Sequence, residues 1–137
     1  MKKVNLTCII DDDPIFVFGI KKVMELINFS DSIMVFKNGQ EALDNLRPII
    51  LAKKSLPDVI LLDLNMPVLD GWQFLDEFIK IPCPKKIIIY IVSSSIDPED
   101  VLKAKSYREV SDYIVKPITI ERLKAVLYNF EKDKVKF

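Results

Sequence analysis

Residues 59–71 read VILLDLNMPVLDG, and this stretch decides the fold. It begins with four apolar residues, continues with the carboxylate of Asp63, and then runs through a turn into the start of a helix. A continuous apolar run of this length is typical of a strand buried on both faces of a parallel sheet. Because ligands bind outside the carboxyl ends of the strands in open α/β sheets, Asp63 is predicted to face a crevice.

A second strand is predicted to end in the same way. Residues 6–10 form a largely apolar run that leads into three consecutive acids, Asp11, Asp12 and Asp13. Asp13 is directly followed by Pro14, a pair typical of a helix N-cap with proline at the first helical position, so we interpret Asp13 as a cap. The strand-end acids then form an oxygen-rich site suited to a hard cation.

The rest of the chain alternates between strand-like and helix-like patterns. The expected strands are residues 6–10, 32–36, 59–63, 87–92 and 113–115, and the expected helices cover residues 14–27 and the stretches that follow Asn38, Asp70, Asp97 and Thr119. Pro48 falls within the second helical pattern and is predicted to kink or end that helix. This alternation favours a parallel sheet covered on both faces, in one domain over residues 1–137. The charged tail at 131–137 is expected to fray.

Composition narrows the class of protein. Twenty basic residues balance twenty acidic ones, so no overall charge favours nucleic acid or an anionic membrane as a partner. No apolar stretch approaches the roughly 20 residues that a membrane span needs, and the expected location is the cytoplasm. Cys8 and Cys83, without any histidine in the chain, are expected to be buried free thiols.

Four motifs follow one another in the order found in a known family. They are IIDDDP at 9–14, LLDLNMPVLDG at 61–71, IVSSS at 91–95 and DYIVKP at 112–117. With them the chain resembles the receiver domain of two-component response regulators, of the chemotaxis-regulator type. That resemblance implies an α/β, flavodoxin-like (βα)5 three-layer sandwich, with a five-stranded parallel sheet of order 2-1-3-4-5.

The resemblance also implies a set of functional residues. Asp63 would accept a phosphoryl group from a sensor histidine kinase or a histidine phosphotransfer protein. Mg2+ would be held by the side chains of Asp11, Asp12 and Asp63 and by the backbone carbonyl of Asn65. The remaining implied roles are a phosphoryl hydrogen bond from Ser93, an inward movement of Tyr113, pairing of the phosphoryl oxygens with Lys116, and a cis peptide between Lys116 and Pro117.

Elementary physics is consistent with these roles. Carboxylates that converge on one crevice repel each other by roughly 4 kcal/mol per close pair at an effective dielectric constant near 20, and a divalent cation removes that repulsion. Oxygen ligands alone suit magnesium. Phosphoryl transfer depends mainly on positioning and charge neutralisation, which Mg2+, Lys116 and Ser93 would supply.

Several hypotheses about the function remain open. The favoured one is a single-domain response regulator that is not an enzyme apart from its own phosphorylation and dephosphorylation. It would either dock on a downstream target protein or relay the phosphoryl group, with a possible phosphorylation-dependent dimer. The chain could also be a receiver fragment of a larger regulator or a hybrid kinase. A magnesium-dependent phosphatase with an aspartyl-phosphate intermediate fits less well, because Asn65 stands where such haloacid-dehalogenase-like enzymes carry a second aspartate.

Overall fold

The structure, a computed structural model, describes residues 4–135. Within that range the strands are β1 (Val4–Ile10), β2 (Ser30–Phe36), β3 (Val59–Leu62), β4 (Ile88–Ser93) and β5 (Val110–Val115). The helices are α1 (Pro14–Leu26), α2 (Gly39–Leu51), α3 (Gly71–Phe78), α4 (Pro98–Lys105) and α5 (Ile120–Val135). The expected fraying concerns residues 131–137, of which 136 and 137 lie outside the described residues, while α5 runs on to Val135.

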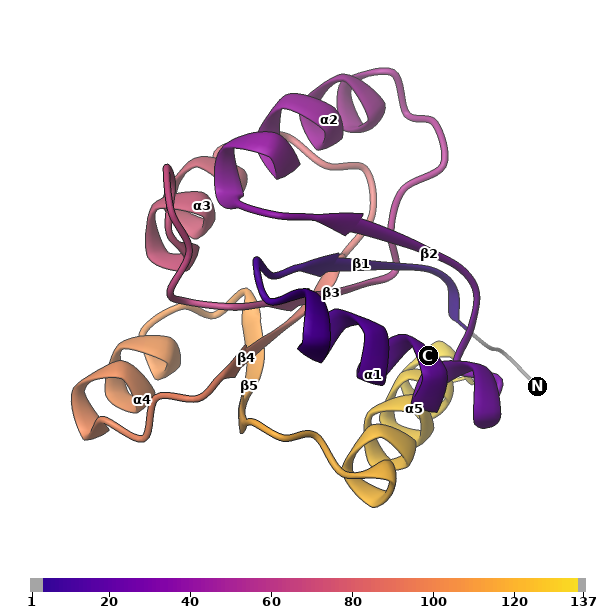
Figure 1. Cartoon of the computed structure of the whole chain (residues 1–137). Helices are drawn as coiled ribbons and strands as arrows, with labels where there is room; N and C mark the ends of the chain where they lie inside the picture. Colours follow the sequence, from indigo (N-terminus) through magenta and orange to yellow (C-terminus); the bar gives the residue numbers. More distant parts are fainter. Residues whose placement is uncertain (1–3, 136–137) are drawn as a thin grey trace.

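The five strands form one parallel sheet of order β2-β1-β3-β4-β5. The flavodoxin-like fold and strand order expected from the sequence are therefore confirmed. Ile10 at the end of β1 lies beside Phe36 and Leu62, and Leu62 lies beside Ile91. Because the strand ends are in register, the residues that follow β1 and β3 meet at one edge of the sheet (Figure 1).

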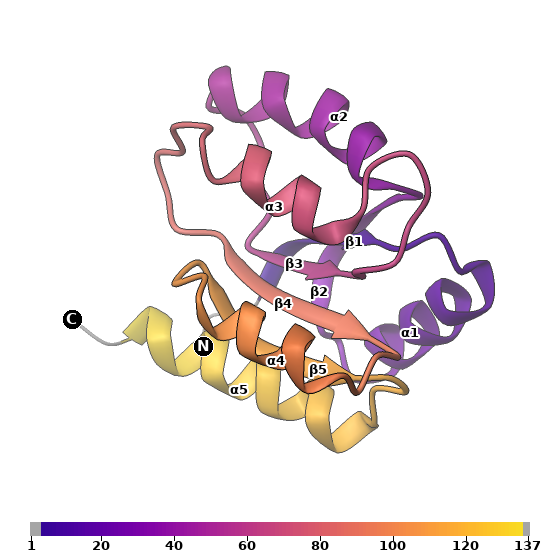
Figure 2. The same cartoon turned by 90° about the vertical axis from the view of Figure 1, so that its left-hand side faces the viewer.

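The helices cover the sheet in two layers. Helices α2, α3 and α4 pack on one face, over the alternating β1 and β3 residues Cys8, Ile10, Ile60 and Leu62. Helices α1 and α5 pack on the other face, over Ile9, Leu61, Val92 and Ile114. Figures 1 and 2 show the resulting three-layer sandwich. The near-continuous apolar strands follow from this burial on both faces.

Side-chain caps set the helix starts. The Asp13 side chain accepts hydrogen bonds from the amides of Ile15 and Phe16, which confirms its interpretation as the α1 cap. Asp70 and Gln73 form a reciprocal capping box at the start of α3. These caps fix where each helix leaves the loops that border the sheet edge.

Three sequence expectations need correction. Pro48 does not end α2, which continues to Leu51, because the proline lies in the last turn and its missing N–H costs one hydrogen bond while Ile50 beyond it is buried. Strand β5 begins at Val110 rather than Tyr113. Cys8 is buried but Cys83 is exposed, since the turn that carries it lies on the surface.

Among the described residues, no helix combines the length and apolar character that crossing a bilayer requires.

Candidate functional site

Three carboxylates converge at the carboxyl edge of the sheet. One oxygen from each of Asp11, Asp12 and Asp63 lies within 4.8 Å of the other two. Asp11 and Asp63 are buried, with 3% and 6% of their surface exposed, while Asp12 is exposed. An all-oxygen set with two buried members and one open side fits a hard divalent cation that keeps part of its water shell.

Backbone hydrogen bonds hold two of these acids in place. The Asp63 amide donates to the Ile10 carbonyl at 2.9 Å, and the Asp11 amide donates to the Phe36 carbonyl at 3.0 Å. Each acid therefore extends the strand pairing by one residue beyond the regular sheet. The Leu64 amide donates to Asp63 Oδ1 at 2.9 Å, which orients that carboxylate from its own turn.

The turn after β3 requires glycine at position 71. A Cβ atom at Gly71 would lie 2.4 Å from the Asp63 carbonyl oxygen and 2.8 Å from the Leu64 Cα. The Gly71 amide donates to the Leu64 carbonyl at 2.9 Å. The close approach of this residue therefore sets the backbone path on which Asp63 lies.

Lys116 brings a cation to the acids from the end of β5. Its Nζ lies 2.8 Å from Asp11 Oδ2 and 3.8 Å from Asp63 Oδ1, and only 15% of its side chain is exposed. The ammonium also lies over the Phe16 ring, 4.3 Å from its centroid. Phe16 was not predicted as a site residue, because an aromatic in the first turn of a helix carries no signal of that contact. The Lys116–Pro117 peptide bond is cis.

Burial raises the pKa values of both buried acids. The pKa of Asp63 is raised to about 6, first by burial and next by the neighbouring Asp11 charge, with Lys116 acting in the opposite direction. The pKa of Asp11 is also raised by burial, against the hydrogen bond from Lys116. A divalent cation held by these acids would favour their ionised forms and lower both pKa values.

Ser93 and Tyr113 lie at the ends of the neighbouring strands. Ser93 is fully buried, and its Oγ accepts a hydrogen bond from the Ser95 amide at 3.1 Å. The Tyr113 ring is half-buried, and its hydroxyl donates to the Ser95 carbonyl at 2.9 Å. The Lys116 amide donates to the Ser93 carbonyl at 2.9 Å, so β4 and β5 deliver these residues in register. Asn65 is exposed in the turn after β3, and the role expected for its carbonyl stays a prediction.

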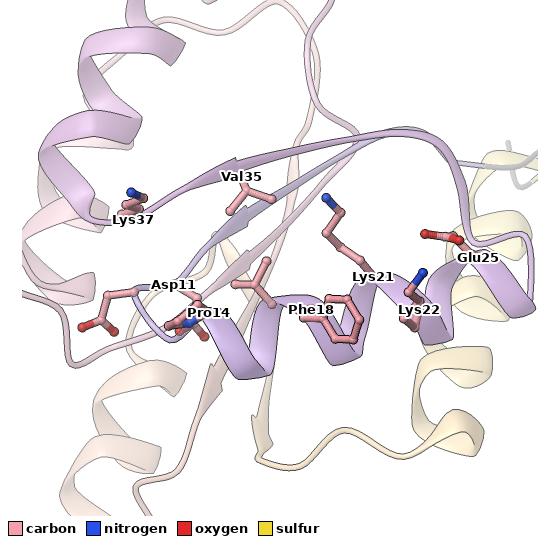
Figure 3. Close-up of a pocket in the computed structure, with 10 residues that line it drawn as sticks. Asp11, Pro14, Phe18, Lys21, Lys22, Glu25, Val35 and Lys37 are labelled. Atoms are coloured by element: carbon pink, nitrogen blue, oxygen red, sulfur yellow. The ribbon is translucent and has the colours of Figure 1, made fainter.

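A groove of about 550 Å³ runs from the acids along α1 (Figure 3). Its lining includes Asp11 and Asp12 at one end, Phe18 and Lys21 from α1, and Lys37 after β2. The exposed Phe18 ring carries the Lys22 ammonium 5.4 Å from its centroid. The acid cluster is thus bordered by an apolar and basic surface rather than by open solvent alone.

Comparison with known proteins assigns this arrangement to a family. The family model of the response regulator receiver domain matches residues 7–128. The probable methanogenesis regulatory protein FilR2 of Methanothrix harundinacea is 29% identical over 116 residues, which are 85% of this chain and 74% of that protein. The nitrate/nitrite response regulator NarL of Escherichia coli is 30% identical over 120 residues, 88% of this chain and 51% of that protein. The chain thus spans about half the length of NarL.

Solved structures agree with the sequence match. A two-component response regulator from Cytophaga hutchinsonii superimposes with a TM-score of 0.85 at 29% identity, over 96% of this chain and 99% of that one. The receiver domain of the sensor histidine kinase PA1611 from Pseudomonas aeruginosa, which has magnesium in its active site cleft, shares the fold with a TM-score of 0.74 at 17% identity, over 92% and 96% of the two chains. From its sequence match, its sheet order and the cluster at the strand ends, the chain belongs to the family of response regulator receiver domains.

Proposed function

We propose that Asp63 is the phosphoacceptor of this receiver domain, and that the domain signals by changing shape when it is phosphorylated. The observation that carries this proposal is the convergence of Asp63 with Asp11, Asp12 and Lys116 at the carboxyl edge of the sheet. Among these acids, Asp63 is held by the turn after β3 and lies closest to the middle of the sheet, between the ends of β1 and β4.

The transfer step follows from the chemistry of these groups. A carboxylate oxygen of Asp63 attacks the phosphorus of a phosphohistidine, the P–N bond breaks, and the imidazole keeps the electron pair. Lys116, now on Asp11 and Asp63, pairs with the phosphoryl oxygens. Asp11, Asp12, Asp63 and the Asn65 carbonyl would hold Mg2+, which supplies charge neutralisation at the transferring group.

The partners follow from this step. The phosphoryl donor is a sensor histidine kinase or a histidine phosphotransfer protein. The groove along α1 borders the acids and supports an approach of the donor from that side. The phosphorylated form acts on a downstream protein, or pairs with a second copy, through the face formed by α4, β5 and α5. The domain catalyses only its own phosphorylation and dephosphorylation.

Intact mass spectrometry tests the acceptor. With magnesium and acetyl phosphate, the wild-type chain should gain one phosphoryl group, and Asp63→Asn should gain none. Asp44→Asn, which removes an exposed carboxylate on α2, is the matched control and should label normally. Normal labelling of Asp63→Asn would overturn the assignment.

A further inference from the structure

We infer that Ser95 is the positioning residue that couples the phosphoacceptor site to helix α4, an inference that rests on the proposed function above. Ser95 lies in the loop between β4 and α4 and is half-buried. Its backbone contacts Ser93 and Tyr113, and its side chain contacts the first turn of the helix.

The backbone of Ser95 connects two strand ends. Its amide donates to Ser93 Oγ at 3.1 Å, and its carbonyl accepts from the Tyr113 hydroxyl at 2.9 Å. Ser93 uses an acceptor lone pair in this bond, so its hydroxyl hydrogen is left to donate to a phosphoryl oxygen. When Ser93 moves toward a phosphorylated Asp63, it draws the Ser95 amide with it. The Ser95 carbonyl, which accepts the Tyr113 hydroxyl, then moves with the same loop.

The Ser95 hydroxyl connects the same loop to α4. It donates to Asp100 Oδ2 at 2.7 Å and accepts from the Asp97 amide at 3.2 Å. Asp97 is the N-cap of α4, and Asp100 lies in its first turn. One hydroxyl therefore holds the start of the helix to the loop that responds to Ser93.

Helix α4 depends on such polar contacts because it buries little. Within α4, all of which is described, Ala104 is the one buried residue, while Leu102 is 65% exposed. At its far end the Lys103 ammonium lies over the Trp72 ring, 4.9 Å from the centroid. A helix with so small a buried surface can shift at low cost, so a contact at its first turn has a large influence on its position.

The three consecutive serines make a matched set for the test. The hydroxyl of Ser93 is the one proposed to contact the phosphoryl group, and the hydroxyl of Ser95 contacts Asp100. Ser94 is exposed, and its hydroxyl makes no hydrogen bond in the described part of the chain. A hydrogen bond to a carboxylate biases an equilibrium between two arrangements by roughly tenfold or more. Its removal in Ser95→Ala should uncouple α4 while leaving the two backbone contacts of Ser95 in place.

The experiment compares amide and ring NMR shifts with and without beryllofluoride and magnesium. In Ser95→Ala the shift changes over residues 98–105 should fall to about half of the wild-type changes or less, because the variant loses the roughly tenfold bias from the hydrogen bond to Asp100. The shift changes around Tyr113 should persist. Ser94→Ala should respond like wild type, Ser93→Ala should lose both responses, and Ser95→Thr should restore the response of α4. Asp100→Ala should reproduce the selective loss, and the double variant Ser95→Ala with Asp100→Ala should lose no more than either alone.

Phosphorylation of the same samples by acetyl phosphate separates the two proposals. Equal labelling of Ser95→Ala and wild type, with equal shift changes in α4, would overturn only the role of Ser95 and leave the proposed function standing. Absence of labelling in wild type would overturn the proposed function and this inference with it.

Discussion

Asp63 is a buried side chain that carries an ionisable group. It is 6% exposed, it accepts the Leu64 amide, and its nearest cation, Lys116, lies closer to Asp11 than to Asp63. Burial and the Asp11 charge raise its pKa to about 6. The ionised form of Asp63 therefore destabilises the fold, and a cation bound beside it would offset that cost.

The first prediction follows from that cost. The folded pKa of about 6 lies above the unfolded value of 3.8, so the penalty for ionised Asp63 is fully present above pH 6 and disappears as the pH falls from 6 toward 3.8. Asp63→Asn should raise the free energy of unfolding by about 1–3 kcal/mol at neutral pH. Denaturant unfolding in a metal chelator, repeated at falling pH, measures this gain. It should shrink below pH 6, and a variant less stable than wild type at neutral pH would contradict the account.

Single residues also show what the sequence could not predict. The acids and Lys116 could be predicted because they directly follow apolar runs in recognisable motifs. The contacts of Phe16 and Ser95 could not be predicted, because they depend on which neighbour a side chain meets after folding. Val68 adopts a φ of 69° in the turn before α3, a strained conformation for a β-branched residue that no local pattern announces.

At the scale of elements, type and order were predictable and boundaries were not. Apolar runs and caps located every strand and helix, since burial on two faces and orphan amides at helix starts both leave local signals. The start of β5 was misplaced, and Pro48 does not end α2 as one of the two expected outcomes would have had it. Val110 joins the sheet through a bulge in the pairing of β4 and β5, and α2 passes Pro48 because Ile50 is buried. Both outcomes depend on tertiary contacts.

A third buried acid, Asp58, connects the strands at the opposite edge of the sheet. Asp58, 5% exposed, precedes β3, and its Oδ2 accepts the Asn5 amide of β1 at 2.8 Å and the Leu6 amide at 3.2 Å. Its other oxygen pairs with Lys85, just before β4. Burial alone would raise the pKa of Asp58, but the hydrogen bonds from Lys85 and the two amides lower it below its usual value. One carboxylate thus ties the starts of three strands.

The second prediction concerns the contacts of Asp58. Asp58→Ala leaves two amides and a lysine without their acceptor and should cost about 2–3 kcal/mol of stability at neutral pH. Because the folded pKa of Asp58 is lowered, its contribution is present above its unfolded value of 3.8 and lost as the pH falls through the still lower folded value. Denaturant unfolding at neutral and acidic pH measures both effects. Lys85→Met should also destabilise, while Lys86→Met, at an exposed neighbour, should not.

Across the whole molecule, the two edges of the sheet have opposite electrostatics. At the amino edge Asp58 pairs with Lys85, whereas at the carboxyl edge three acids converge and Lys116 pairs with two of them, Asp11 and Asp63. The core of apolar strands between them is rigid enough to hold like charges together, a cost that an isolated loop would relieve by moving apart. The stability of the whole domain should therefore respond to a cation bound at one edge.

The last prediction tests that response with two adjacent acids. A ligand that binds only the folded state stabilises it by about 2.7 kcal/mol at a hundred times its dissociation constant, so Mg2+ should raise the melting temperature of wild type. Asp12→Asn removes a charged ligand and should abolish most of the rise. Asp13→Asn is the matched control, because asparagine caps a helix as well as aspartate and Asp13 is occupied with the amides of Ile15 and Phe16. It should keep the full rise in thermal melts with and without Mg2+. An Asp12→Asn variant as responsive to Mg2+ as wild type would mean that the cation binds without Asp12, and the metal site drawn from these three acids would be wrong.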